Sequence, residues 1–373
     1  MQKKILFCFG TRPEAIKMCS LVHTMKKSEF DIKVCVTAQH REMLDQVLDF
    51  FEVVPDYDLN IMKPGQSLNE LSGRIFINID EVLADAKPDL VLVHGDTTTS
   101  SICAWAAFHR GIKVGHIEAG LRTFDRYAPF PEEINRQITG KLADFHFAPT
   151  PISEQNLLDE KVLAENIAVT GNTVIDSLLW TVDKLKSNYS NPRIDELKAK
   201  VDFSKNVILV TGHRRENFGD GFLNICKALA NIATNADVEI VFPVHLNPNV
   251  QEPVMKLLSE YKNIHLIEPL DYPSFVYTMM KSYFIITDSG GVQEEAPSLG
   301  KPVLVMRDTT ERPEAVAAGT VKLVGTSFSA ISDNAFGLLN SLTIYDQMSK
   351  SYNPYGDGKA NDRIAEFIKK KLS

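Results

Sequence analysis

The stretch that decides the fold class is Ile5-Leu-Phe-Cys-Phe9, followed at once by Gly10-Thr-Arg-Pro-Glu-Ala-Ile-Lys17. Five consecutive apolar residues predict a strand that is buried on both faces, as in a parallel sheet. Gly10 ends this strand, and Pro13 stands where the first turn of a helix tolerates proline. A strand that turns directly into a helix is typical of β-α-β units, so we expect an α/β fold.

The same alternation of short apolar runs and helical patterns continues along the chain, which at 373 residues is long enough for two domains. The polar stretch Lys186–Lys205 interrupts the alternation and indicates a change of domain. We therefore expect two Rossmann-like domains, residues 1–172 and 173–353, with a helix in 354–373 that can pack back onto the first domain. The expected strands are Ile5–Phe9, Ile32–Thr37, Leu90–His94, Val114–Ile117, Phe145–Phe147, Val207–Thr211, Val238–Pro243, Ile264–Ile267, Tyr283–Thr287 and Val303–Met306.

Composition excludes several classes of protein. A net charge of −8 disfavours a nucleic-acid binder, which needs a basic face. No run of about 18 apolar residues occurs, so we expect no membrane insertion. Five scattered cysteines without a CxxC pair suit reduced thiols in the cytoplasm. The nine histidines show no HExxH or similar spacing, so we expect no metal site.

Charged and small residues stand at nearly every expected strand end. In a parallel sheet these ends meet at one edge, where ligands bind beside helix N-termini. We therefore expect one large cleft between the two domains. The residues at the strand ends include Arg12, Lys17, Gln39, Asp96, Glu118, Arg122, His213, Arg214, His245, Asp288, Ser289, Gly290, Gly291, Arg307 and Arg312.

Two glycine-containing loops suggest phosphate binding. Asp288-Ser-Gly-Gly291 leads into an expected helix, Val292–Leu299, and lets the backbone approach a phosphate, while Glu294 or Glu295 could accept ribose hydroxyls. An ordinary glycine turn is the alternative. The Gly10 loop brings the cations Arg12 and Lys17 to a strand end, which suits a diphosphate, and solvated charges at a helix end are the alternative. The loop lacks the second and third glycines of a GxGxxG motif, so we expect no NAD. Together with the missing metal spacings, this predicts a reaction without a bound cofactor.

Acid–base chemistry would need carboxyl groups, and three are candidates: Asp96, Glu118 and Glu132. Asp96 could instead cap the expected helix Thr97–His109, and Glu133 competes with Glu132 because spacing alone does not choose between them. His213 is flanked by two arginines, which favours a neutral imidazole that binds phosphate or sugar.

A series of motifs runs in order along nearly the whole chain: Phe9-Gly-Thr-Arg-Pro-Glu-Ala-Ile-Lys17, Val93-His-Gly-Asp96, Gly115-His-Ile-Glu-Ala-Gly-Leu-Arg122, Pro131-Glu-Glu-Ile-Asn-Arg136, Thr211-Gly-His-Arg-Arg-Glu-Asn217, Pro243-Val-His-Leu-Asn-Pro248, Thr287-Asp-Ser-Gly-Gly-Val-Gln-Glu-Glu-Ala-Pro297, Arg307-Asp-Thr-Thr-Glu-Arg-Pro313 and Asn353-Pro-Tyr-Gly-Asp357. This series resembles the bacterial non-hydrolysing UDP-N-acetylglucosamine 2-epimerases. The resemblance implies a glycosyltransferase-B-like fold, with UDP held mainly by the second domain. It also implies a cytoplasmic homodimer that supplies N-acetylmannosamine units for cell-surface polysaccharide.

The implied reaction interconverts UDP-N-acetylglucosamine and UDP-N-acetylmannosamine by anti elimination of UDP to 2-acetamidoglucal and re-addition. The resemblance assigns catalysis to Asp96, Glu118, Glu132 and His213. It assigns UDP or sugar binding to Arg12, Lys17, Arg136, Phe275, Ser289, Gly290, Gly291, Glu295 and Arg312. Gln39, Arg214 and His245 match part of a second, activating substrate site, although Gly65 stands where some members carry an arginine. A hydrolysing 2-epimerase, a transferase of the same fold and a non-catalytic UDP-sugar binder remain alternatives.

Overall fold

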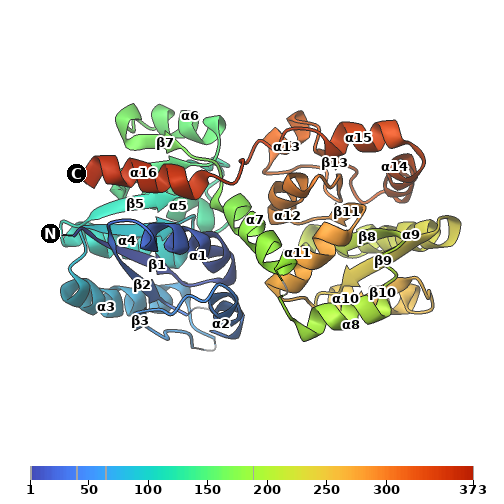
Figure 1. Cartoon of the computed structure of the whole chain (residues 1–373), viewed down its shortest axis with the longest axis horizontal. Coiled ribbons are helices and arrows are strands. Elements are labelled where there is room, and N and C mark those ends of the chain that lie inside the picture. Colours follow the sequence, from blue (N-terminus) through green and yellow to red (C-terminus); the bar gives the residue numbers. More distant parts are fainter. Residues whose placement is uncertain (1, 39–40, 64, 188, 373) are drawn as a thin grey trace. The chain divides into compact units, whose positions relative to one another are not determined.

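The computed structural model describes residues 2–38, 41–63, 65–187 and 189–372 (Figure 1). The chain divides into two compact units, one of Met1–Leu179 with Tyr355–Ser373 and one of Trp180–Pro354. The division falls inside helix α7 (Thr173–Lys186). The polar stretch that follows contains helix α8 (Pro192–Lys200), which begins because the Asn191 side chain accepts a hydrogen bond from the Arg193 backbone N–H at 2.8 Å.

The first unit contains a seven-stranded parallel sheet in the order β3-β2-β1-β4-β5-β6-β7. Its strands are β1 (Lys4–Phe9), β2 (Asp31–Val36), β3 (Tyr57–Asp58), β4 (Leu90–His94), β5 (Lys113–Ile117), β6 (Phe145–Ala148) and β7 (Ile167–Val169). Its other helices are α1 (Arg12–Lys26), α2 (Arg41–Phe50), α3 (Leu68–Ala86), α4 (Thr98–His109), α5 (Glu132–Leu142), α6 (Pro151–Asp159) and α16 (Ala360–Leu372). Apolar side chains of the central strands pack against apolar side chains of α3 and α4, and together they form one core cluster.

The second unit contains a six-stranded parallel sheet in the order β10-β9-β8-β11-β12-β13. Its strands are β8 (Asn206–Thr211), β9 (Val238–Pro243), β10 (Ile264–Ile267), β11 (Phe284–Thr287), β12 (Val303–Val305) and β13 (Val321–Leu323). Its helices after α8 are α9 (Asp220–Asn235), α10 (Pro248–Leu258), α11 (Tyr272–Lys281), α12 (Gly290–Glu295), α13 (Pro313–Ala317), α14 (Phe328–Asn340) and α15 (Leu342–Ser349). The expected helix Val292–Leu299 is thus divided, because a 3-10 turn, Ala296–Leu299, follows α12.

Both sheets have the doubly wound strand order of Rossmann-like folds, so the predicted α/β class is confirmed. In each sheet the order reverses between the first strand and its neighbour, β1 beside β4 and β8 beside β11. Loops leave this reversal point in opposite directions and open a crevice at the carboxyl ends of the two strands. The residues that follow β1, β4, β8 and β11 are therefore the first place to look for a ligand site.

The C-terminal helix α16 lies against α1 in the first unit (Figure 1). Its first turn is held by Asp176, whose carboxylate accepts hydrogen bonds from the backbone N–H groups of Ala360 and Asn361 at 3.2 and 2.9 Å. Asn361 in turn donates to the Ser20 hydroxyl at 3.0 Å. Burial raises the pKa of Asp176 to about 6. No helix in the described ranges combines the length and the apolar character that crossing a bilayer requires.

Candidate active site

The reversal point of the first sheet is organised by Glu14, a buried residue of α1. Its carboxylate accepts hydrogen bonds from the backbone N–H groups of Gly10 and Thr11 at 3.0 and 2.8 Å, and from the Thr97 hydroxyl at 2.7 Å. One side chain thereby ties the loop after β1 to the loop after β4. Gly10 has to be glycine here, because a Cβ would overlap the hydroxyl of Thr37.

Asp96 follows β4 at this point and does not cap the next helix. Thr97 is the N-cap of α4, since its hydroxyl accepts the Ser100 N–H at 3.1 Å. The Asp96 carboxylate instead forms a close ion pair with Arg136 of α5. Burial raises the pKa of Asp96, and Arg136 opposes this rise. A carboxyl group with a raised pKa is a stronger base than an ordinary aspartate, which suits proton exchange with a ligand at this strand end.

Glu118 follows β5 with a left-handed backbone, φ 62°, which is uncommon for a residue with a side chain. Its Oε2 atom accepts a hydrogen bond from Asn172 at 2.8 Å and forms a close ion pair with Lys17 of α1. A strained backbone that aims a carboxylate at a cation is typical of functional sites. Four side chains that the sequence placed on different elements therefore lie together at the carboxyl ends of the strands of the first sheet: Asp96, Glu118, Arg136 and Lys17.

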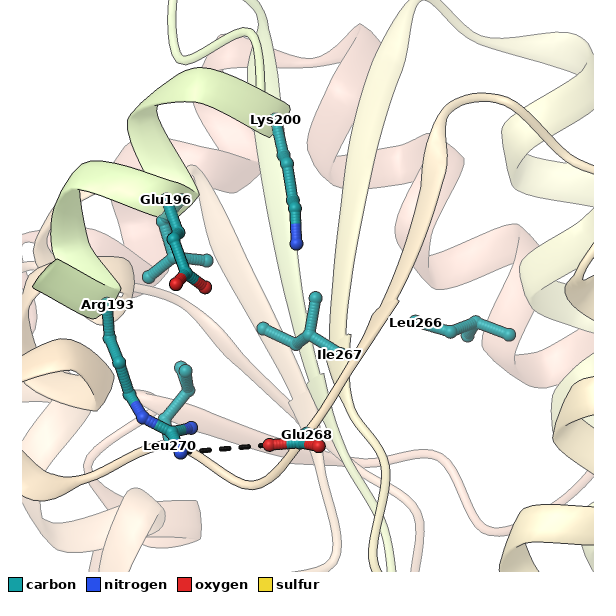
Figure 2. A pocket seen from close by; sticks show the side chains of 8 residues that line it. Arg193, Glu196, Lys200, Leu266, Ile267, Glu268 and Leu270 are labelled. Atoms are coloured by element: carbon teal, nitrogen blue, oxygen red, sulfur yellow. Dashed lines mark ion pairs between the residues drawn. The ribbon is translucent and has the colours of Figure 1, made fainter.

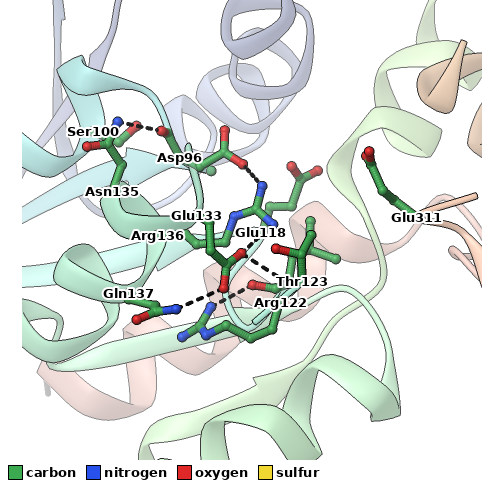
Figure 3. A network of polar contacts seen from close by, with 12 residues as sticks. Asp96, Ser100, Glu118, Arg122, Thr123, Glu133, Asn135, Arg136, Gln137 and Glu311 are labelled. Atoms are coloured by element: carbon green, nitrogen blue, oxygen red, sulfur yellow. Dashed lines mark hydrogen bonds and ion pairs between the residues drawn. The ribbon is translucent and has the colours of Figure 1, made fainter. Parts of the chain in front are cut away.

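Glu132 and Glu133 both stand in the first turn of α5, and their surroundings differ. Glu133 is fully buried and accepts hydrogen bonds from the backbone N–H groups of Thr123 and Phe124 at 3.1 and 3.2 Å (Figure 3). It also accepts from Gln137 at 2.8 Å. Glu133 therefore holds the loop after β5, whereas Glu132 is half-buried and keeps its place as the candidate acid.

The second unit repeats the arrangement at its own reversal point. Asp288 follows β11, is fully buried, and accepts hydrogen bonds at one oxygen from the backbone N–H groups of His213 and Arg214, both at 2.8 Å. Its other oxygen, Oδ1, lies 3.5 Å from Nδ1 of His213 and has no hydrogen-bond partner. The carboxylate thus favours a proton on Nδ1, which leaves Nε2 of His213 for a ligand.

The glycine loop leads into α12, whose N-cap is Ser289 and whose first residues are Gly290 and Gly291. Arg312 forms a close ion pair with the buried Glu294. The hydroxyl of Tyr272 donates to the buried Glu295 at 3.1 Å. Of the two glutamates, Glu294 is thus the ion-pair partner of Arg312, which the sequence predicted as a UDP or sugar contact.

The remaining predicted residues lie in varied surroundings. Arg12 begins α1 and is half-buried, and Phe275 packs against the small apolar cluster that α8 forms with β8 and β9. His245 stacks on His213 with ring centroids 5.4 Å apart, and burial lowers its pKa. Arg214 lies 4.0 Å from Glu311. Gln39 lies outside the described residues.

A pocket of about 420 Å³ lies elsewhere, beside α8 and the end of β10 (Figure 2). Arg193 and Glu268 face each other across it at 3.7 Å. None of the predicted site residues that the structure describes lines this pocket. Its lining residues are Arg193, Glu196, Leu197, Lys200, Leu266, Ile267, Glu268 and Leu270. Throughout residues 2–38, 41–63, 65–187 and 189–372, no group of three or more His, Cys, Asp or Glu residues could hold a metal ion.

Comparison with known proteins decides the family. A family model described as UDP-N-acetylglucosamine 2-epimerase matches residues 23–369. A UDP-N-acetylglucosamine 2-epimerase of Escherichia coli K12 is 59% identical over 371 residues, which cover 98% of each chain. The chain belongs to the UDP-N-acetylglucosamine 2-epimerase family.

Solved structures agree with this assignment to the UDP-N-acetylglucosamine 2-epimerases. The enzyme of Neisseria meningitidis bound to UDP-GlcNAc superposes with a TM-score of 0.90 at 52% identity, covering 98% of this chain and all of the other. The Methanocaldococcus jannaschii enzyme, in complex with UDP-GlcNAc and UDP, gives 0.81 at 34% identity, covering 98% and 99%. The predicted family and glycosyltransferase-B-like fold class are confirmed.

Several residues of the site had no individual sequence prediction. Glu14 stands in a Thr-x-x-Glu capping box, a signal that indicates a helix start and not a link between two loops. His94 and Asn172 lie beside Glu118, which is distant from both in the chain. Asp288 was expected in the glycine loop, but its contact with His213 was not. These residues hold the groups that the sequence singled out.

Proposed function

We propose that this chain interconverts UDP-N-acetylglucosamine and UDP-N-acetylmannosamine without hydrolysing them. The observation that carries the proposal is the 59% identity to the Escherichia coli enzyme over nearly the full length of both chains. The solved relatives that hold UDP-GlcNAc or UDP add support, since 52% and 34% of their residues are identical to this chain. We assign the reaction to the cytoplasm, because all five cysteines are buried free thiols.

The chemistry follows from the acidity of the sugar's C2 proton. No carbonyl adjoins C2, so the proton is not acidic enough for simple removal and return. Elimination solves this problem: the C2–H and C1–O bonds break, a C1=C2 double bond forms, and UDP leaves as an anion. Re-addition of UDP to 2-acetamidoglucal, with a proton delivered to the opposite face of C2, gives the epimer. Each direction needs an acid or base at C2 and cations at the departing diphosphate.

The residues of the first unit supply the acid–base groups in this proposal. Asp96, Glu118 and Glu132 are the candidates for proton exchange at C2, and the raised pKa of Asp96 suits a group that both takes and returns a proton. Lys17 provides positive charge beside Glu118. Arg136 keeps the Asp96 carboxylate in place through its ion pair.

The residues of the second unit bind UDP in this proposal. Ser289, Gly290 and Gly291 present backbone N–H groups to phosphate, with Arg312 as a nearby cation. Glu295 is the candidate acceptor of ribose hydroxyls. His213, oriented by Asp288, assists at the phosphate or leaving oxygen through Nε2.

Product analysis tests the proposal. Incubation with UDP-N-acetylglucosamine, followed by anion-exchange chromatography, should yield two UDP-sugars and no free sugar. Accumulation of free N-acetylmannosamine with UDP would instead indicate a hydrolysing 2-epimerase. A transferase would consume the donor only after an acceptor is added, and a binding protein would leave the substrate unchanged.

We also propose that the chain forms a homodimer through α3 and α4. An aromatic cluster, Phe76, Trp105, Phe108 and His109, lies on these helices, with neighbouring ring centroids 6.0–6.3 Å apart. Trp105 is 40% and Phe108 57% exposed. Aromatic residues are enriched at protein interfaces relative to the rest of the surface, which supports this face as the contact between two copies.

A further inference from the structure

His94 is a buried polar residue of the first unit that the proposed chemistry does not yet use. It ends β4, beside the reversal point of the sheet, and is 3% exposed. Its Nε2 atom has no hydrogen-bond partner and lies 3.9 Å from Oε2 of Glu118. A buried polar atom without a hydrogen-bond partner lowers the stability of the folded state, so the position of this nitrogen beside a carboxylate requires an explanation.

The state of the imidazole is set by its surroundings. Burial lowers the pKa of His94 to about 4, so the ring is neutral at physiological pH. A neutral imidazole carries one N–H donor and one acceptor nitrogen. A carboxylate can only accept, so the form with its proton on Nε2 matches Glu118. His94 can therefore donate a hydrogen bond to Glu118, but cannot form an ion pair with it.

Glu118 has a competing partner in Lys17. The lysine forms a close ion pair with the same oxygen, Oε2, that faces His94 and accepts from Asn172. A cation this close stabilises the carboxylate and makes it a weaker base. The family resemblance assigns Lys17 to UDP or sugar binding, so in this inference its ammonium also attracts the anionic diphosphate of the substrate. A phosphate beside the ammonium shares its positive charge and its three N–H donors, so in this inference substrate binding weakens the pair with Glu118.

We propose that His94 is a positioning residue, which donates a hydrogen bond to Glu118 when the substrate's diphosphate draws Lys17 away. This inference rests on the proposed function. The neutral donor keeps the carboxylate aimed, after a movement of about 1 Å that shortens the 3.9 Å separation to hydrogen-bond distance. Because the donor is neutral, Glu118 remains a stronger base than in its ion pair. Substrate binding and activation of the base are thereby coupled.

Two substitutions of similar size distinguish the effect of the hydrogen-bond donor from the effect of the side-chain volume. His94→Gln keeps an amide N–H that can reach Glu118, while His94→Met fills similar space without a donor. We expect His94→Met to lower kcat for epimerisation by about 10- to 100-fold with KM within about twofold, and His94→Gln to retain kcat within about threefold. His146→Leu is the control, because His146 is equally buried on β6 and has no place in the proposed chemistry.

The pH profile supplies a readout that a packing defect would not move. Glu118 faces Lys17, Asp96 and His94. Loss of a donor raises the pKa of a carboxyl group. The acidic limb of kcat in His94→Met should therefore move to higher pH, and His94→Gln should restore it. Binding of UDP to the wild-type protein should also change the ¹⁵N resonances of the His94 ring, which the His94→Gln spectrum assigns.

The outcomes distinguish this inference from the proposed function. A wild-type protein that does not epimerise UDP-N-acetylglucosamine refutes the proposed function itself. With an active wild type, equal activity of His94→Met refutes the role of His94. Equal impairment of both variants shows that ring volume matters and not the donor, which also refutes it. If His94→Met does not fold, the ring resonances of the wild type decide, and their indifference to UDP overturns the inference.

Discussion

Replacement of Glu133 by glutamine should destabilise the protein, although the two side chains have the same shape and the same number of heavy atoms. Glu133 is fully buried, and its two oxygens accept from the Thr123, Phe124 and Gln137 N–H groups and from Arg136 at 2.8–3.3 Å. Glutamine turns one acceptor into an NH2 donor that faces other donors. It also removes the negative charge that compensates Arg136, whose side chain is only 11% exposed.

The magnitude follows from these contacts. Hydrogen bonds to a charged group contribute about 1.5–3 kcal/mol each, and breaking one side of a buried ion pair costs about 3–5 kcal/mol. Because Arg136 keeps Asp96 as a second partner, we expect Glu133→Gln to lower the free energy of unfolding by an amount at the lower end of this range, about 3 kcal/mol. For a unit of this size the melting temperature should fall by roughly 6–12 °C.

The matched comparison is Glu132→Gln, one residue earlier in the same helical turn. Because this side chain is half-buried, its replacement should lower the free energy of unfolding by less than about 1 kcal/mol. The kcat of epimerisation should fall by about 100-fold or more. Thermal unfolding followed by circular dichroism, with kcat measured on the same samples, separates the two effects. A Glu133→Gln protein that melts with the wild type, or a Glu132→Gln protein that keeps its kcat, would refute this division of roles.

Three further predictions concern other parts of the chain. Asp288→Asn should lower kcat about 10- to 100-fold, because the carboxylate that favours a proton on Nδ1 of His213 is lost. An unchanged kcat would argue against the role of Asp288 in orienting His213. Trp105→Glu should convert dimers to monomers in sedimentation velocity, whereas monomeric wild-type protein would exclude the proposed interface. Burial raises the pKa of Asp176 to about 6, so the folded state binds this proton more tightly than the unfolded state. Wild type should therefore lose about 1 kcal/mol of unfolding free energy relative to Asp176→Asn as pH rises from 5 to 7, and equal pH slopes would contradict this.

The sheets could be predicted because buried parallel strands are continuous apolar runs. Leu90–His94, Val238–Pro243 and Ile264–Ile267 match their strands residue for residue. The short edge strands Tyr57–Asp58 and Val321–Leu323 have too few residues to stand out from loops. Helix α8 lies in a polar stretch, and its main sequence signal is the Asn-Pro start.

The site was partly predictable for a similar reason. Strand ends indicate which side chains can meet, so Asp96 and Glu118 could be expected near one another. Burial depends on loops that come from elsewhere in the chain, so spacing did not separate Glu132 from Glu133. His94 was not predicted as a site residue for the same reason. In the sequence it is only the last residue of a strand, and its proposed role depends on its position beside Glu118 in the structure.

In the proposed function, this chain exchanges the C2 proton of a UDP-sugar through reversible loss of UDP. Proton NMR of UDP-N-acetylglucosamine with the protein in D2O measures this exchange directly. We expect deuterium at C2 of both UDP-N-acetylglucosamine and UDP-N-acetylmannosamine with the wild-type protein, and no deuterium incorporation with Asp96→Asn or Glu118→Gln. Retention of the C2 proton in every UDP-sugar after long incubation with wild-type protein would contradict it.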